Sequence, residues 1–411
     1  MADRIKAVYG REILNANGKP TVEAELVTEN GIRVSASVPS GTSRGKYEAF
    51  ELYDGGERFD GYGTRKAAAN ISGEINGAVR GLEVTEQEQI DQVLCELEGT
   101  PNKARLGGNA ILAVSVAVAR AGAISQGMPL YRYISQGKRK MRMPNLIATV
   151  IAGGVFSNSG MEFEDYMYVF DGFKDFPSQV EALVSLRKTL EKNLRKRYGN
   201  FLEDGGALAA PCSSSEEAFS WMLETARQKG YENKVFLGLD VAASELFDST
   251  AGLYELQDGR RKTKEELLDY YVELCEKNPL ILIEDGFDQD DWESFAIMRQ
   301  KLPNIEIVGD DLFVTNYQRL RTGIQEGSAN AVLLKINQIG TVSEALRTND
   351  LAVQNGYDVI VSLRSGETGD DFIADLAVGI GARQIKLGSP VRQERNAKYN
   401  RLLKISSEIQ I

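Results

Sequence analysis

Three carboxylates lie at the ends of short apolar segments in the second half of the chain. Asp240 ends the segment KVFLGLD, Glu284 lies in LILIED, and Asp310 lies in IEIVGDD. If these segments are strands of one barrel, the three side chains point into the same opening, where a hard divalent cation would relieve their repulsion. Three oxygen ligands, with space left for water and substrate, suit Mg²⁺ better than a Ca²⁺ cage. Asp240 or Asp310, taken singly, could instead be the N-cap of a following helix.

Cationic side chains end the next apolar segments. Lys335 follows AVLL, where a buried ammonium is costly without a partner or a purpose. Beside another cation, such as Mg²⁺ or Lys386, its pKa would fall and make it available as a neutral base; the alternative is an ion pair with a neighbouring carboxylate. Arg364 and Ser365, in SLRSGET, offer a fork of donors and a hydroxyl to a phosphate or carboxylate, although Ser365 could also cap the following helix.

The chain contains no histidine, so any acid, base or metal ligand must be a carboxylate, lysine, cysteine or tyrosine. This excludes histidine-based catalytic triads and most zinc catalysis. With 48 Lys and Arg against 59 Asp and Glu, the net charge of -11 repels phosphate backbones and anionic lipid headgroups. Neither nucleic acid nor a membrane is therefore an expected partner.

Cysteine usage and the first residues bear on location. Cys95, Cys212 and Cys275 are far apart and odd in number, which predicts neither a disulfide framework nor a zinc-spaced cluster. The first residues, MADRIKAVYGREI, lack the apolar core of a signal peptide. The apolar segment 111–124 is too short to span a membrane and contains Arg120. We expect a cytoplasmic protein.

The first third of the chain has the pattern of a small α+β domain. Two alternating segments in 21–38 meet at Asn30-Gly31, a strong signal for a tight hairpin. Helical patterns follow near 63–80, 85–97 and 107–126. The basic stretch QGKRKMRM comes next, and we interpret it as a solvated linker, the alternative being an anion-binding patch. The 411 residues thus divide into a capping domain, 1–135, and a second domain, 144–411.

From about residue 230, the chain has a repeated pattern of apolar segments that are each followed by an amphipathic helical stretch. From Glu284 onward, the polar residues that end successive segments are 26, 25, 29 and 22 residues apart, close to one strand and helix each. Such units predict an α/β fold with a parallel sheet covered on both faces, either a barrel or a doubly wound sheet. The barrel is favoured because every segment ends in residues suited to chemistry, and because no Gly-rich phosphate loop is present.

Several longer strings resemble the enolase family, and the resemblance covers almost the whole chain. The matching strings are REILNANGKPTVEAEL, PSGTSRG, GGNAILAVS, IEDGFDQDDW, VGDDLFVTN, LLKINQIGT, RSGETGDDFIADLAVG and QIKLGSP. The resemblance implies a (β/α)8 TIM-like barrel of the enolase type, capped by an N-terminal α+β domain. It also implies a homodimer or a higher homo-oligomer.

The resemblance implies roles for the matching metal and base residues. Asp240, Glu284 and Asp310 resemble the ligands of Mg²⁺, and Ser43 resembles the serine that helps to hold a second Mg²⁺. Lys335 resembles the base that removes the α-proton of 2-phosphoglycerate, a small phospho-carboxylate. That proton is very weakly acidic, so its removal needs divalent charge beside the forming ene-diolate. A Lys or His base with one or two Mg²⁺ ions is how enolase-superfamily sites are generally described.

The resemblance also implies a set of substrate-binding residues. Arg364 and Ser365 resemble the pair that binds the substrate phosphate, and Lys386 resembles the lysine beside the substrate carboxylate. Glu164 and Asp165 occupy the family's QEFM segment, which contacts the substrate when the active-site loops close. We expect all five side chains to line one pocket.

The chain departs from the family at several of these positions. Phe156 and Leu363 replace two histidines, and Arg44 replaces a small residue in the SGTSRG loop, adding a cation near the expected phosphate site. Asp165 and Asp204 each replace a glutamate of the family. These changes concern substrate grip and elimination, whereas the residues for proton abstraction are retained.

The residue at position 204 matters most, because the family's glutamate there expels the β-hydroxyl by general acid catalysis. Aspartate withdraws the carboxyl group by about one bond length, and a misplacement of about 1 Å can lower a rate on the order of 100-fold. Glu203 could serve as the acid after a one-residue shift, which the following Gly-Gly pair permits. Three hypotheses follow: a divergent phosphopyruvate hydratase, a paralogue for a related phospho- or phosphono-carboxylate, or an impaired enzyme with a binding role.

Overall fold

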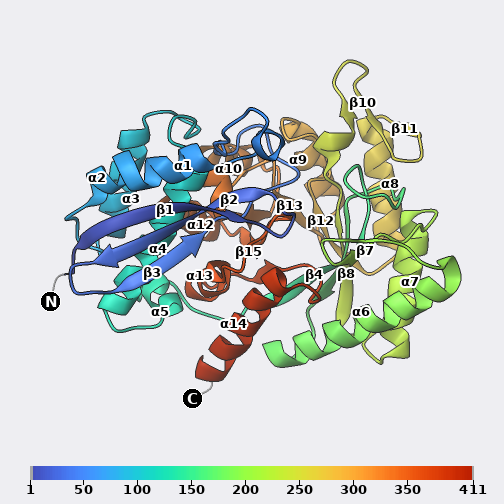
Figure 1. Cartoon of the computed structure of the whole chain (residues 1–411). Helices are drawn as coiled ribbons and strands as arrows, with labels where there is room; N and C mark the ends of the chain where they lie inside the picture. Colours follow the sequence, from blue (N-terminus) through green and yellow to red (C-terminus); the bar gives the residue numbers. More distant parts are fainter. Residues whose placement is uncertain (1–2, 410–411) are drawn as a thin grey trace.

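An antiparallel three-stranded sheet begins the N-terminal domain in the computed structural model, which describes residues 3–409 (Figure 1). Its strands, in spatial order, are β1 (Ile5–Leu14), β2 (Pro20–Thr28) and β3 (Arg33–Ser37). The predicted hairpin is confirmed, since β2 and β3 pair antiparallel. Gly31 lies in the connecting turn with φ of +89°, a conformation that favours glycine.

Five helices pack beside this sheet. They are α1 (Arg65–Asn70), α2 (Asn76–Val79), α3 (Gln87–Glu98), α4 (Gly108–Ser125) and α5 (Leu130–Ser135), with a π-helical turn, Ile71–Ile75, between the first two. Among the described helices, α4 alone is long and apolar enough to cross a membrane, and it is longer than the segment judged too short from the sequence. However, 83% of α4 is buried within the protein, where its small side chains pack on β2 and β3. Its composition is therefore that of a core helix.

Eight strands close into a barrel that forms the second domain. In spatial order they are β4 (Asn145–Ala152), β5 (Asp165–Phe170), β8 (Val235–Asp240), β12 (Leu280–Glu284), β13 (Glu306–Gly309), β14 (Ala331–Leu334), β15 (Asp358–Ser362) and β16 (Gln384–Lys386). The pairing of β16 with β4 closes the ring. The predicted barrel with an N-terminal α+β domain is confirmed. Apolar side chains from several strands fill the interior, including Ile147, Met167 and Leu333.

One strand departs from the parallel order that the sequence pattern predicts. β5 runs antiparallel to both of its neighbours, β4 and β8. The physical reason is the connection from Ala152 to Asp165, which contains no helix that could return the chain to the opposite end of the barrel. β5 consequently begins, rather than ends, at the opening where the other strands end.

Helices surround the barrel, as Figure 1 shows. They are α6 (Phe176–Tyr198), α7 (Ser215–Gln228), α8 (Lys264–Lys277), α9 (Trp292–Lys301), α10 (Tyr317–Glu326), α11 (Ile336–Ile339), α12 (Val342–Gln354), α13 (Phe372–Ile380) and α14 (Gln393–Ile409). Side chains fix several of their starts: Thr263 and Glu266 form a capping box at α8. Short hairpins add β6 (Glu203–Asp204) with β7 (Ala207–Leu208), and β9 (Phe247–Asp248) with β10 (Leu253–Glu255) and β11 (Arg261–Lys262).

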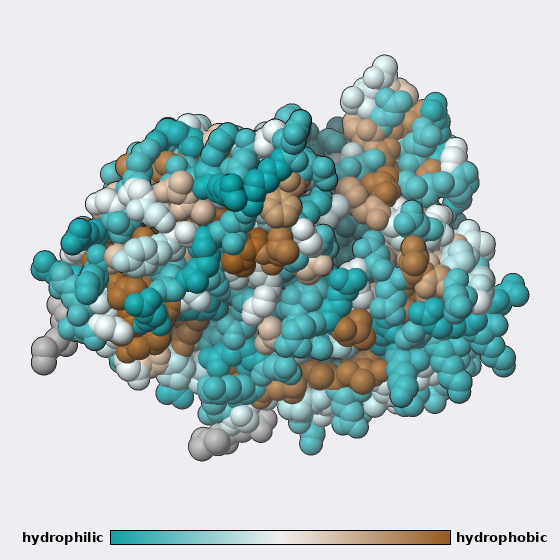
Figure 2. Space-filling model, viewed as in Figure 1, coloured by the Kyte–Doolittle hydropathy of each residue, from teal (hydrophilic) through white to brown (hydrophobic). Residues whose placement is uncertain are grey.

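The segment that joins the two domains is exposed and basic. Most of residues 136–143 lie at the surface, where Arg139 pairs with Asp350 at 2.7 Å. The molecular face in Figure 2 is largely hydrophilic, with apolar groups scattered across it. The barrel itself begins at Asn145.

Candidate active site

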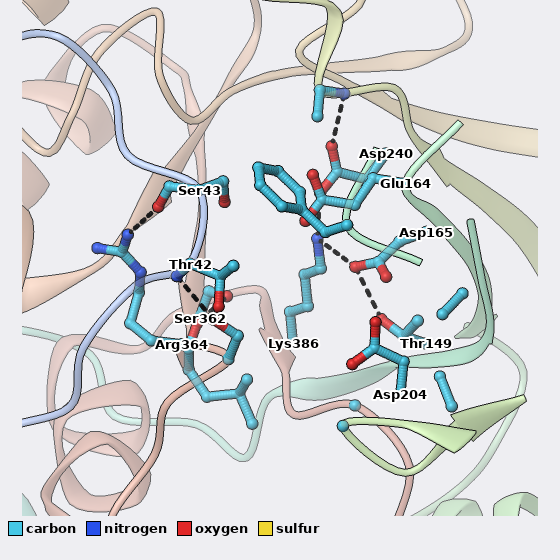
Figure 3. Close-up of a pocket in the computed structure, with 18 of the residues that line it drawn as sticks. Thr42, Ser43, Thr149, Glu164, Asp165, Asp204, Asp240, Ser362, Arg364 and Lys386 are labelled. Carbon is cyan, nitrogen blue, oxygen red and sulfur yellow. Dashed lines mark hydrogen bonds and ion pairs between the residues drawn. The ribbon is translucent and has the colours of Figure 1, made fainter. Parts of the chain in front are cut away.

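A pocket opens at the end of the barrel that faces the N-terminal domain, and both domains line it (Figure 3). Thr42 and Ser43 come from the loop after β3. Most of the other lining residues come from the barrel strands and the loops next to them, Asp204 comes from the β6–β7 hairpin, and Arg395 comes from α14. Its charged lining residues are Glu164, Asp165, Asp204, Asp240, Asp285, Asp310, Asp311, Lys335, Arg364, Lys386 and Arg395. The mixture of buried carboxylates and cations is typical of a site for a charged ligand and a metal ion.

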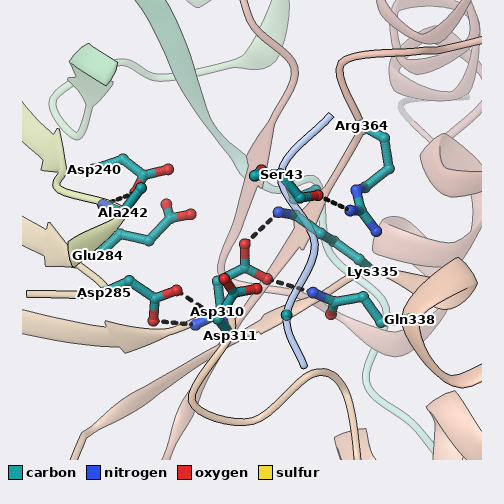
Figure 4. Close-up of polar contacts among 12 residues, drawn as sticks. Ser43, Asp240, Ala242, Glu284, Asp285, Asp310, Asp311, Lys335, Gln338 and Arg364 are labelled. Atoms are coloured by element: carbon teal, nitrogen blue, oxygen red, sulfur yellow. Dashed lines mark hydrogen bonds and ion pairs between the residues drawn. The ribbon is translucent and has the colours of Figure 1, made fainter. Parts of the chain in front are cut away.

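Asp240, Glu284 and Asp310 converge as the sequence predicts. Asp240 and Glu284 are the last residues of β8 and β12 and pair across these neighbouring strands, and Asp310 directly follows β13. All three are buried, and Figure 4 shows them grouped on one side of the site. Asp240 does accept a hydrogen bond from the Ala242 amide at 3.2 Å. The carboxylate of Asp310 is instead bound by side chains, so helix capping does not account for the set.

Two lysines reach into this acidic group. The Lys386 ammonium donates to Asp240 at 2.7 Å and to Glu284 at 2.8 Å, and it lies 3.3 Å from Asp165. Lys335 donates a hydrogen bond to Asp310, whose other oxygen accepts from Gln338 at 2.7 Å. Both lysines are buried, so each ammonium depends on these carboxylates to offset its desolvation.

The pKa of Lys335 moves in the direction opposite to the sequence-based expectation. Burial is the largest single influence and lowers the pKa of Lys335, but the neighbouring carboxylates, Asp310 foremost and then Glu284, together raise it above its ordinary value. Burial likewise opposes the charge of Lys386, but Asp240 and Glu284 hold its pKa well above the ordinary value. The expected lowering depended on a neighbouring cation, and in this arrangement the nearest charge to Lys335 is a carboxylate.

The acidic group has the chemistry of a divalent-cation site. Burial and Asp240 raise the pKa of Glu284, and one of its oxygens, Oε1, has no hydrogen-bond partner among the described residues. An orphaned buried carboxylate oxygen beside two more carboxylates fits an oxygen-seeking cation. The group Asp240, Glu284 and Asp310 therefore fits a metal ion.

Among the described residues, a different and overlapping group has ligand oxygens within 4.8 Å of one another: Asp285, Asp310 and Asp311. Both oxygens of Asp285, however, accept backbone hydrogen bonds, from Asp310 at 2.9 Å and from Asp311 at 2.7 Å. These bonds make Asp285 a fixed support for the turn after β13. The set that contains Glu284, with its free oxygen, is the better candidate for direct metal ligands.

Arg364 and Ser365 lie together where the N-terminal loop crosses the opening. The buried Arg364 guanidinium donates to both oxygens of Glu48, at 2.9 and 3.1 Å, and to the Ser43 carbonyl at 2.8 Å. The Ser365 hydroxyl accepts from the Thr42 amide at 2.9 Å. Ser365 is not a helix cap, because α13 begins only at Phe372. The predicted anion-binding pair is thus placed in the pocket and held by residues 42–48.

Asp165 and Glu164 line the pocket on the barrel side. Thr149 on β4 donates a hydrogen bond to Asp165 Oδ2 at 3.0 Å, and Figure 3 shows that Asp165 also contacts Lys386. Burial, followed by the charges of Asp240 and Asp165, raises the pKa of Glu164 well above its ordinary value. A raised pKa favours the protonated form of this carboxyl group, which can donate a hydrogen bond.

Asp204 faces the pocket and Glu203 does not. Figure 3 shows Asp204 on the same side as Thr149 and Asp165. Glu203 instead binds Arg187 at 2.8 Å on the outer side of the β6–β7 hairpin. Burial and the charge of Asp165 raise the pKa of Asp204, the direction that suits a proton donor. The hairpin therefore does not have the one-residue shift that would place Glu203 in the pocket.

The departures from the family have different positions. Phe156 and Leu363 both line the pocket, so its surface is apolar at the two positions where the resemblance implies histidines. Arg44 does not reach the pocket: its guanidinium donates to Glu51 at 2.8 Å and to Tyr53 at 2.7 Å. The expected additional cation near the phosphate site is therefore wrong for this arrangement.

Three functional neighbours were not singled out from the sequence. Thr149 orients Asp165, Glu48 holds Arg364, and Asp285 supports the turn of Asp310. Thr149 could have been noticed, since it is a polar residue inside the apolar strand NLIATVIA. Glu48 lies in a different domain from its partner, so no local pattern indicates their contact.

Comparisons with known proteins match the whole described architecture. A model described as the enolase N-terminal domain matches residues 5–134, and one described as the enolase C-terminal TIM barrel domain matches residues 140–410. An enolase from Methanopyrus kandleri is 45% identical over 412 residues, covering 99% of this chain and 96% of that protein. Enolases from Rubrobacter xylanophilus and Methanocaldococcus jannaschii are 45% and 44% identical, each covering 98% of this chain and 95% of the relative.

Proposed function

Because this chain belongs to the enolase family, we propose that it interconverts 2-phosphoglycerate and phosphoenolpyruvate, as a phosphopyruvate hydratase of the hydro-lyase class. The observation that carries the proposal is the content of one pocket. The pocket is lined or adjoined by three buried carboxylates that could bind a metal ion, two lysines, the Arg364–Ser365 pair and Asp204. Each is a group that removal of an α-proton and a β-hydroxyl requires.

We infer that Asp240, Glu284 and Asp310 hold Mg²⁺, with Ser43 beside a second ion. The donor set consists of hard oxygens, and Glu284 keeps one oxygen free for a ligand. When bound there, Mg²⁺ supplies positive charge for the oxygens of the substrate carboxylate. The same carboxylates bind Lys335 and Lys386 in the structure, so these lysines and a cation compete for them.

Lys335 is the proposed base for the first half of the reaction. Its Nζ accepts the proton from C2 of 2-phosphoglycerate, and the electron pair of the C–H bond moves into the carboxylate to form an ene-diolate. Loss of the Asp310 contact would remove the charge that now raises the pKa of Lys335, leaving burial to lower it. Lys386, fixed beside Asp165 and Asp240, lies beside the substrate carboxylate and stabilises the added negative charge.

Asp204 is the proposed acid for the second half. It donates a proton to the β-hydroxyl as the C3–O bond breaks, water leaves, and the ene-diolate electrons form the C2–C3 double bond. Burial and Asp165 keep a proton on this carboxyl at higher pH than is usual for aspartate. Glu164 and Asp165 line the same side and contact the substrate there. Arg364 and Ser365 bind the phosphate.

A related substrate is the second candidate, because Phe156 and Leu363 make part of the pocket apolar. These side chains would favour a phospho- or phosphono-carboxylate with a less polar substituent at that position. The buried charges argue against a protein that only binds, since their burial is costly without a ligand. Comparing turnover of 2-phosphoglycerate with that of such analogues separates the two candidates.

The decisive experiment combines two measurements on the purified protein with Mg²⁺ and 2-phosphoglycerate. Formation of phosphoenolpyruvate reports the whole reaction, and exchange of the C2 proton in heavy water reports abstraction alone. Lys335→Ala should lower both by roughly 10²- to 10⁴-fold, the usual contribution of a positioned base. Lys103→Ala, at a buried lysine paired with Glu344 outside the pocket, is the matched control and should keep both rates.

The outcomes of this experiment are distinct. Turnover in the unaltered protein supports the hydratase, and exchange without turnover favours a different substrate. Absence of both reactions would contradict the proposed chemistry, as would full activity in Lys335→Ala. A cytoplasmic location, a homodimer or higher homo-oligomer, and the domain boundaries 1–135 and 144–411 stay predictions, which fractionation, sedimentation and limited proteolysis would test.

A further inference from the structure

Arg395 is a buried cation whose place in the pocket is not explained by an ion pair. It lies in the first turn of α14, is 6% exposed and lines the same pocket as Asp204. The other pocket cations, Lys335, Lys386 and Arg364, each contact a carboxylate. Within residues 3–409, Arg395 has no carboxylate within ion-pair distance, and its Nε has no hydrogen-bond partner. A buried guanidinium in this condition calls for a role.

The guanidinium lies against two glycines, Gly205 and Gly388, which both line the pocket. A Cβ placed on Gly205 would lie 2.6 Å from Arg395 Nη2, and one placed on Gly388 would overlap Nη1. Nη1 also donates a long hydrogen bond, 3.5 Å, to the Leu387 carbonyl. These glycines belong to the turn of the β6–β7 hairpin, which carries Asp204, and to the segment that follows Lys386 on β16. Arg395 therefore sets the spacing between them.

We propose that Arg395 is a positioning residue for elimination: wedged against Gly205 and Gly388, its guanidinium holds the hairpin turn so that Asp204 faces the substrate β-hydroxyl. This inference rests on the proposed function. Arg395 does not position the proposed base, Lys335, which follows β14 and is held by Asp310. The first half of the reaction is accordingly independent of Arg395, and the second half depends on it.

The position also suits the charge that elimination creates. Once Asp204 has given its proton to the leaving hydroxyl, it is a carboxylate at the solvent-exposed side of the pocket. Burial and Asp165 oppose that charge, whereas Arg395 and Arg392 favour it and lower the pKa of Asp204. Of these two arginines, Arg395 has the larger effect on the pKa of Asp204. An aspartate cannot reach as far as a glutamate, so its role as the acid depends on its backbone being held in place.

The test uses Arg395→Met and Arg395→Lys in the full chain with Mg²⁺, and measures C2 proton exchange and formation of phosphoenolpyruvate side by side. Arg395→Met should lower dehydration on the order of 100-fold, mainly in kcat, while exchange is retained. Arg395→Lys should recover part of the loss. Combining Arg395→Met with Asp204→Asn should be no worse than Asp204→Asn alone, since both act on one step.

A matched control removes another arginine from the same helix. Arg401 pairs with Asp375 at 2.6 Å, and neither residue lines the pocket, so Arg401→Met should lower the melting temperature without changing the ratio of dehydration to exchange. A folded Arg395→Met in which both rates fall equally, or neither falls, would overturn the positioning role. An unaltered protein that exchanges without dehydrating would instead overturn the proposed function.

Discussion

Replacing Lys386 by methionine tests how the acidic group is held together. One ammonium serves Asp240 at 2.7 Å, Glu284 at 2.8 Å and Asp165 at 3.3 Å. Methionine keeps most of the volume of the side chain and removes its charge, which leaves three carboxylates without their shared cation. Removing one partner of a buried ion pair typically costs about 3–5 kcal/mol. We expect Lys386→Met to lose stability of this size in the absence of a divalent cation.

Magnesium should reverse much of this loss. A ligand at 100 times its dissociation constant stabilises a folded protein by about 2.7 kcal/mol, and the variant has no ammonium to compete for the carboxylates. The difference in unfolding free energy between variant and unaltered protein should therefore shrink when Mg²⁺ replaces EDTA. Urea unfolding at one pH, followed by circular dichroism in both buffers, measures the difference.

Lys398→Met is the control for this experiment. Lys398 is equally buried and donates to Glu367 at 2.6 Å, but neither residue is among the proposed metal ligands. Its loss of stability should be the same in Mg²⁺ and in EDTA. If Lys386→Met also loses the same stability in both buffers, then Mg²⁺ does not bind at Asp240 and Glu284, and the reasoning fails. A variant more stable than the unaltered protein in EDTA would refute the importance of the ammonium.

Two further predictions concern single carboxyl groups. Asp204→Glu restores the missing methylene and should raise dehydration by up to about 100-fold without changing C2 exchange; an unchanged rate would mean that the hairpin already delivers the shorter side chain. Glu306 begins β13 at the opposite end of the barrel, and burial raises its pKa from 4.5 to about 7. The folded protein thus holds a proton that the unfolded chain releases near pH 4.5, so stability falls as pH rises to about 7, by roughly 3 kcal/mol. Glu306→Gln should remove this fall in urea unfolding at pH 5 and 8; an equal slope in both proteins would contradict it.

The strand ends were predictable because their signal is local. An apolar segment followed by a polar residue is contained within a few positions, and this pattern placed Asp240, Glu284 and Asp310 at strand ends. The regular spacing of these units predicted the barrel, and the barrel in turn predicted their convergence. The absence of histidine limits the candidate bases to carboxylates, lysine, cysteine and tyrosine from the sequence alone. The resemblance to known strings then supplied the substrate.

The contacts within the pocket were decided by the tertiary structure. A short connection without a helix turned β5 antiparallel, against the parallel expectation. The β6–β7 hairpin directs the Asp204 side chain into the pocket and the Glu203 side chain toward Arg187. This orientation depends on residues that are distant in sequence and contact the hairpin in the folded protein.

The state of each charge was decided in the same way. Lys335 has a raised pKa because Asp310, 25 positions earlier in the chain, lies against it. Arg395 lies in the pocket because helix α14 packs behind two glycines that are distant in sequence. The sequence alone determined which chemical groups this protein possesses and which ends of its strands carry them. Their protonation and their partners required the folded structure, since electrostatic energy depends on distances across space and on burial, which local patterns do not contain.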